Sequence, residues 1–157
     1  MDRREMLGML GAGALGLSAL SASASDEKCD ASCCELDKVH EDCLKMCAKC
    51  AKVCDQTFHH CYMELSQGKK EYAKALHLAS DCAEFCGLSA CMIAKHSPLM
   101  AYSCTACAEA CKETAAEVEK FDSEVMKHAA KKLHDCERSC REMVASMKGS
   151  DHGGSTS

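Results

Sequence analysis

The sequence lacks several features that mark common protein classes. No apolar run approaches the roughly 18 to 20 residues of a membrane-spanning helix, so no membrane span is expected. Lysine and arginine form no basic patch, and the formal net charge is −5, which argues against a nucleic-acid partner. We find no nucleophile–base arrangement and no open metal position beside a general base, and therefore expect no enzymatic activity.

Aromatic side chains are also scarce. The chain has no tryptophan, three phenylalanines, three tyrosines and a single proline. It has instead 16 cysteines among 157 residues, far above ordinary usage, and this calls for disulfides or bound metal. A chain of this length is enough for one domain, in which thiols replace much of the ordinary hydrophobic core.

The start of the chain has the composition of an export signal. Two arginines at 3–4 precede a weakly hydrophobic, Gly- and Ala-rich stretch at 6–20, and Ala-Ser-Ala at 22–24 fits a cleavage site. Paired arginines in this position are typical of the twin-arginine (Tat) route, although acidic residues flank them here. We predict that residues 1–24 are a Tat-type signal peptide and that the protein is exported to the periplasm.

Four helical segments follow, separated by short connections. The first is expected over 36–67, ending at the capping glycine Gly68, and the second over 70–96. Ser97-Pro98 predicts the start of the third, because serine is a good N-cap and proline a good first helical residue.

The fourth helix is expected to begin at a cap formed by Asp122 or Ser123. Connections this short make successive helices antiparallel, so we predict an all-α, antiparallel up-down four-helix bundle over 36–148. Residues 25–35 are then an N-terminal lead-in and residues 149–157 a Gly/Ser-rich disordered tail.

The cysteines of the expected helices follow one face of each helix. In the first helix they are separated by 4, 3, 4 and 7 residues, which places them within an arc of roughly 60°. That face is the one that packs into a bundle core, where leucine or isoleucine normally lies. The four sets are Cys43, Cys47, Cys50, Cys54 and Cys61; Cys82 and Cys86; Cys104, Cys107 and Cys111; Cys136 and Cys140.

Folding the chain at its three turns brings all these cysteines except Cys61 to one level, in a segment about 15 to 18 Å long. The other half of the bundle is expected to be filled by hydrocarbon side chains. These are Phe58, Leu65, Leu76, Val118, Phe121, Val125 and Leu133. We therefore predict a cysteine-lined core at one end and a hydrocarbon core at the other.

Three chemistries could use such a core. Disulfides fit poorly within one helix, because neighbouring Cβ atoms are about 5 to 6 Å apart and a disulfide needs about 3.5 to 4.5 Å; cross-helix pairs stay open. Zinc or an iron–sulfur cluster needs compact four-ligand sites rather than a continuous stripe. Copper(I) fits best, since soft thiolates select it and two or three sulfurs suffice. Multiple Cu(I) ions would displace the thiol protons and neutralise the column.

Segments 81–86, 97–99, 104–111 and 136–140 resemble the exported branch of the copper storage protein family. The resemblance covers about residues 36–147. It implies a four-helix bundle, often a homotetramer, whose core takes up more than ten Cu(I) ions without catalytic turnover. It also implies a copper-acceptor protein; in methane-oxidising bacteria this is thought to be the membrane methane mono-oxygenase.

Several candidate ligands have more than one interpretation. Cys61 is as readily a plain buried thiol, and Cys91 lies about 180° from Cys82 on an ideal helical wheel. Cys29, Cys33 and Cys34 precede the bundle and either add metal ligands or pair as a disulfide.

The sulfur-lined end also carries His40, Met46 and Met143, whose imidazole and thioether groups could receive copper at the mouth, although methionine often simply fills cores. The prediction is an exported protein that stores on the order of ten or more Cu(I) ions per chain and supplies copper enzymes. The alternatives are a general thiolate sink for zinc or cadmium and a disulfide-stapled helical scaffold.

Overall fold

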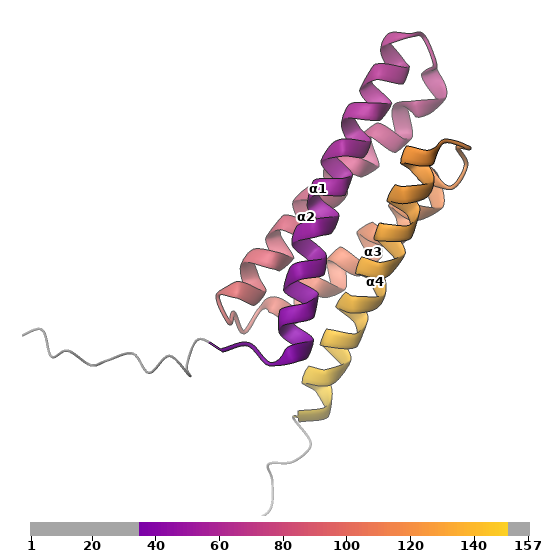
Figure 1. Cartoon of the computed structure of the whole chain (residues 1–157). Helices are drawn as coiled ribbons and strands as arrows, with labels where there is room; N and C mark the ends of the chain where they lie inside the picture. Colours follow the sequence, from indigo (N-terminus) through magenta and orange to yellow (C-terminus); the bar gives the residue numbers. More distant parts are fainter. Residues whose placement is uncertain (1–34, 151–157) are drawn as a thin grey trace, which may run out of the picture. The chain divides into compact units, whose positions relative to one another are not determined.

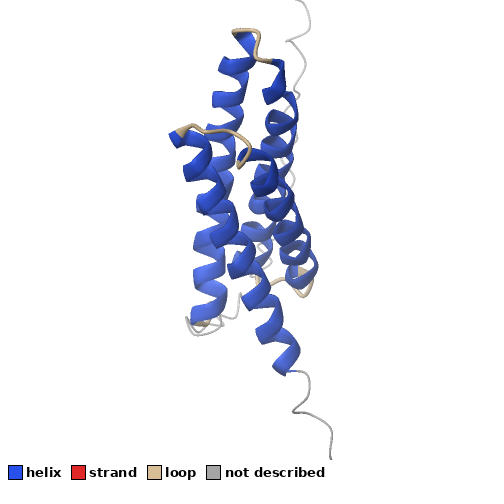
Figure 2. Cartoon of the chain, turned by 90° about the vertical axis from the view of Figure 1, so that its right-hand side faces the viewer, coloured by secondary structure: helices blue, strands red, loops and turns tan. Residues whose placement is uncertain are grey.

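The computed structural model describes residues 35–150 of the chain. This part contains four α-helices and one short 3-10 helix, and no strand is found within it (Figure 2). Their bounds are α1 Lys38–Ser66, η2 Lys70–Tyr72, α2 Ala73–Ala94, α3 Met100–Val118 and α4 Glu124–Ser150.

The four helices form an antiparallel bundle. Helix α1 packs against α2 and α4, and α3 packs against the same two helices, so each helix has two neighbours around a shared core (Figure 1). The predicted all-α, up-down four-helix bundle is therefore confirmed.

Helices α1 and α2 end in the same hydrogen-bonded motif. At the end of α1 the N–H of Gly68 donates to Leu65 and that of Lys69 to Glu64, with Gly68 in the left-handed region at φ 88° as expected for a capping glycine. The end of α2 repeats the motif with His96, at φ 49°, in the glycine position. The N–H of Ser97 then donates to Met92 at 3.0 Å.

This cap explains why the expected start of the third helix is wrong. Ser97 belongs to the end of α2, so the chain makes a further turn, in which Met100 N donates to the Ser97 carbonyl, before α3 begins at Met100. The Ser97 hydroxyl accepts from Leu99 N at 3.2 Å. For α4, Ser123 is the cap, accepting from Met126 N at 3.3 Å, as predicted.

The hydrocarbon half of the core differs in part from the prediction. Val118 and Leu133 are at most 1 % exposed, but Phe58 and Val125 are 38 % and 42 % exposed and lie on the surface. The reason on α1 is that the buried stripe continues through Thr57, which is 2 % exposed, and Phe58 is rotated about 100° from it. Partly buried side chains packed against this half include Leu65, Leu76 and Phe121.

Other sequence predictions fall at the chain ends. The signal peptide at 1–24 and nearly all of the lead-in at 25–35 lie outside the described residues. Helix α4 continues to Ser150, two residues into the segment expected to be a tail. Within 35–150, no helix has the length and hydropathy needed to cross a membrane.

Candidate metal centre

One end of the bundle core is built from thiols. Within each helix the cysteines of this end are three or four residues apart, so that they share its inward face. The eleven cysteines predicted to share one level are each at most 1 % exposed. They form the sulfur column: Cys43, Cys47, Cys50, Cys54, Cys82, Cys86, Cys104, Cys107, Cys111, Cys136 and Cys140.

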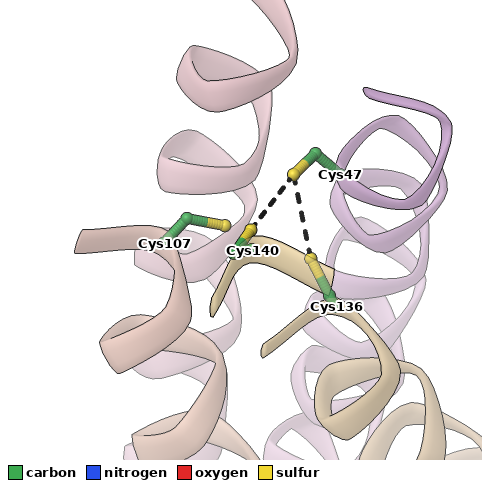
Figure 3. A group of neighbouring side chains, drawn as sticks. All are labelled: Cys47, Cys107, Cys136 and Cys140. Carbon is green, nitrogen blue, oxygen red and sulfur yellow. Dashed lines mark hydrogen bonds between the residues drawn. The ribbon is translucent and has the colours of Figure 1, made fainter. Parts of the chain in front are cut away.

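Sulfur atoms from different helices approach one another closely. Cys47 Sγ lies 3.5 Å from Cys140 Sγ and 4.0 Å from Cys136 Sγ, and Cys107 points toward the same centre (Figure 3). On the other side of the column, Cys86 Sγ lies 3.5 Å from Cys107 Sγ and 3.8 Å from Cys111 Sγ. The column is therefore assembled across the helices rather than along one of them.

The column contains three groups of cysteines, and within each group every sulfur lies within 4.8 Å of the others. They are Cys43, Cys104 and Cys140; Cys47, Cys107, Cys136 and Cys140; and Cys50, Cys86, Cys111 and Cys136. Cys136 and Cys140 each belong to two groups, so the two cysteines of α4 connect the three groups.

The spacing of the sulfurs suits a bound metal ion. Two thiolates that each bind a metal at about 2.3 Å, the zinc–sulfur length, are at most about 4.6 Å apart. The cross-helix distances of 3.5 to 4.0 Å satisfy this condition without moving a helix. All thirteen described cysteines are free thiols, so residues 35–150 contain no disulfide staple.

Hydrogen bonds between thiols set the protonation of the column. Hydrogen bonding with Cys107 and Cys111 raises the pKa of Cys86, and burial raises it further. The pKa of Cys107 is lowered, because Cys111, Cys136 and other neighbours stabilise its thiolate, while burial opposes this. No lysine, arginine or histidine is buried among the described residues, so only a bound cation could neutralise several thiolates here.

Two other cysteines do not join the column. Cys61 is fully buried in the hydrocarbon half, where burial raises the pKa of its thiol to about 11. Cys91 is exposed on α2, which removes it from the column and leaves the predicted ligand role without support. Cys29, Cys33 and Cys34 lie outside the described residues.

The predicted mouth ligands lie on α1 and α4, each within about one helical turn of Cys43 or Cys140, whose Sγ atoms are 3.8 Å apart. His40 is partly buried there, with Nδ1 2.8 Å from both carboxylate oxygens of Asp37, the residue that caps α1. Met143 is fully buried one helical turn beyond Cys140, and Met46 is partly buried. The structure thus places all three near this end of the bundle, with the two methionines packed as core side chains.

An antiparallel four-helix bundle with a column of free, buried thiols defines a helical protein whose core can hold metal ions. The family model for copper storage proteins matches residues 36–145, and the chain belongs to this family, as its resemblance predicted. This is a storage family rather than a family of enzymes. The Cu(I)-bound copper storage protein BsCsp3 has a similar structure, with a TM-score of 0.63 and 29 % sequence identity over 68 % of this chain and 99 % of that chain. No curated protein matches the chain.

Proposed function

We propose that the protein stores on the order of ten or more Cu(I) ions per chain in the sulfur column. The observation that carries the proposal is the contiguity of eleven buried thiols, whose cross-helix sulfur distances include 3.5 Å between Cys47 and Cys140. Soft thiolates select Cu(I), and two or three of them complete its coordination. The Cu(I) bound by BsCsp3 supports this choice of metal.

The column binds its cargo by exchanging protons for copper. Hydrogen bonding with neighbouring thiols, together with burial, raises the pKa of Cys86 and of Cys140, which favours the protonated form of these two thiols when no metal is present. Each incoming Cu(I) displaces protons, so the core passes from neutral thiols to a near-neutral copper–thiolate cluster. Residues such as Cys136, shared between two groups, allow one ion to be placed next to another.

A titration of the reduced full-length chain with Cu(I), without oxygen, tests the storage role. Thiol counting accompanies it, and the thiolate-to-copper absorbance is followed to saturation. We expect saturation at about ten or more ions. Saturation at one or two ions would reject storage.

Zinc is the second candidate cargo, because two of the sulfur groups offer four thiolates, the ligand set of a structural zinc site. The same titration in the presence of excess zinc separates the two functions. Copper should displace zinc, whereas equal retention of both metals would favour a general thiolate sink for zinc or cadmium.

We further propose that the chain is exported through the twin-arginine route, works in the periplasm, assembles as a homotetramer and passes copper to an acceptor protein. The paired arginines at 3–4 support export, and the resemblance to exported copper storage proteins supports the tetramer and the acceptor. Replacing both arginines with lysine in a host with a twin-arginine translocase should leave the full-length chain in the cytoplasm. If this variant still reached the periplasm and lost its first 24 residues, the twin-arginine route would be contradicted. The homotetramer is tested separately, by measuring the mass of the protein in solution by light scattering.

A further inference from the structure

A buried serine of α2, Ser89, lies in line with the column cysteines of that helix. The buried stripe of α2 continues from Cys82 and Cys86 to Ser89 with the same steps of 4 and 3 residues. Ser89 is fully buried, and it occupies the position where the stripe would place another cysteine. The sequence-based site prediction omits Ser89, although this spacing was the available signal.

Ser89 lies opposite Cys104 in the packing of α2 against α3. The two antiparallel helices bring Cys82 Sγ to 3.6 Å from Cys111 Sγ and Cys86 Sγ to 3.5 Å from Cys107 Sγ, and one turn further in the same register Ser89 faces Cys104. Cys104 forms a group with Cys43 and Cys140, so α1, α3 and α4 each supply a sulfur to this layer of the bundle and α2 supplies a hydroxyl.

The Ser89 hydroxyl also has no hydrogen-bond partner among the described residues. The three other buried serine and threonine side chains each donate to a carbonyl of their own helix: Thr57 to Val53, Ser103 to Met100 and Thr114 to Ala110. A buried hydroxyl without a partner destabilises the fold, so its retention beside a candidate metal ligand requires an explanation.

We propose that Ser89 is a positioning residue that donates a hydrogen bond to the Cys104 sulfur when copper is bound. This inference rests on the proposed storage function. When Cu(I) displaces the Cys104 proton, the sulfur becomes a strong acceptor, and the hydroxyl gains the partner that it lacks without metal. The hydrogen bond offsets negative charge in a layer where three thiolates can outnumber the copper ions.

The changes in melting temperature and copper affinity caused by Ser89→Ala distinguish a role in copper binding from a purely structural role. In Ser89→Ala the metal-free protein loses no hydrogen bond, so its melting temperature should stay the same or rise. The copper ions of this layer should bind roughly ten- to a hundredfold more weakly and should be removed first, because a hydrogen bond to a charged acceptor contributes about this much to affinity. The number of ions should not change, because no sulfur is removed.

The matched control is Ser103→Ala, which removes a buried hydroxyl that already has a carbonyl acceptor. It should lower the melting temperature of the metal-free protein and leave copper affinity unchanged. A third variant, Ser89→Cys, completes the layer with a fourth sulfur and should bind copper at least as tightly as the wild type.

The experiment is competition between each full-length, reduced protein and a chromophoric Cu(I) chelator, with melting followed by circular dichroism. Unchanged or tighter copper binding in Ser89→Ala, or equal weakening in Ser89→Ala and Ser103→Ala, would overturn the role of Ser89 alone. A wild-type chain that holds only one or two ions would overturn the storage function and this inference together.

Discussion

The two cysteines of α4 should control far more of the copper capacity than their number suggests. Cys136 and Cys140 occupy four of the eleven ligand places in the three sulfur groups, because each is shared by two groups. Replacing both with alanine therefore leaves no group complete. We predict that Cys136→Ala/Cys140→Ala loses more copper than any pair of cysteines outside the groups.

The expected magnitude follows from this sharing. The group of Cys43 and Cys104 retains two sulfurs, the group of Cys47 and Cys107 retains two, and the third group retains three of four. If each lost ligand place weakens one ion, roughly three or four ions are lost for two thiols removed. The metal-free protein should remain folded, because each Cys→Ala change costs roughly 1 kcal/mol, against a typical stability of about 5 to 15 kcal/mol.

The matched control removes the same number of thiols from outside the column. Cys61→Ala/Cys91→Ala should keep the wild-type capacity, since Cys61 is isolated in the hydrocarbon half and Cys91 is exposed. Both double variants are titrated with Cu(I) without oxygen, after circular dichroism has shown that they are helical. Equal losses in the two variants would refute the reasoning, because capacity would then follow thiol number and not the grouping.

Three further predictions concern the parts of the bundle outside the sulfur groups. Leu133→Ala, at a side chain 1 % exposed, should lower the free energy of unfolding by about 2 to 5 kcal/mol in chemical denaturation without changing copper capacity. Cys91, the exposed thiol among the thirteen described cysteines, should be alkylated before the other twelve in the native metal-free protein, as mass spectrometry of brief iodoacetamide labelling can show; prior labelling of a column thiol would contradict the burial. The pKa of Glu117 is lowered, chiefly by its 2.8 Å hydrogen bond with Lys120 and also by Lys74. The ionised carboxylate therefore stabilises the fold above the ordinary carboxyl pKa, and this stabilisation is lost as the pH falls through the lowered pKa. Glu117→Gln should therefore be about 1 kcal/mol less stable than the wild type at pH 7, with the difference vanishing in acid, and a pH-independent difference would contradict the ion pairs.

The helical stripes were fully determined by the local sequence. Steps of 3 and 4 residues place successive cysteines on one face whatever the rest of the chain does, because the helical repeat of 3.6 residues is a local property. The same holds for the caps at Gly68 and Ser123, where the residue type fits the backbone conformation or supplies the hydrogen bond. These features were enough to predict the bundle and its eleven-cysteine column.

Only the tertiary structure decided which sulfurs face each other. The rotation of each helix about its axis depends on side chains contributed by the other helices, and a rotation of one residue moves a side chain by about 100°. That rotation buries Thr57 and exposes Phe58. The outward direction of Cys91, by contrast, follows from the helical repeat, which places it about 180° from the buried Cys82. The register of α2 against α3, set by the Cys82–Cys111 and Cys86–Cys107 contacts, also places Ser89 opposite Cys104, and no spacing within α2 could reveal this pairing. Periodicity along one helix therefore predicts the ligands, but the packing between helices determines how they are grouped.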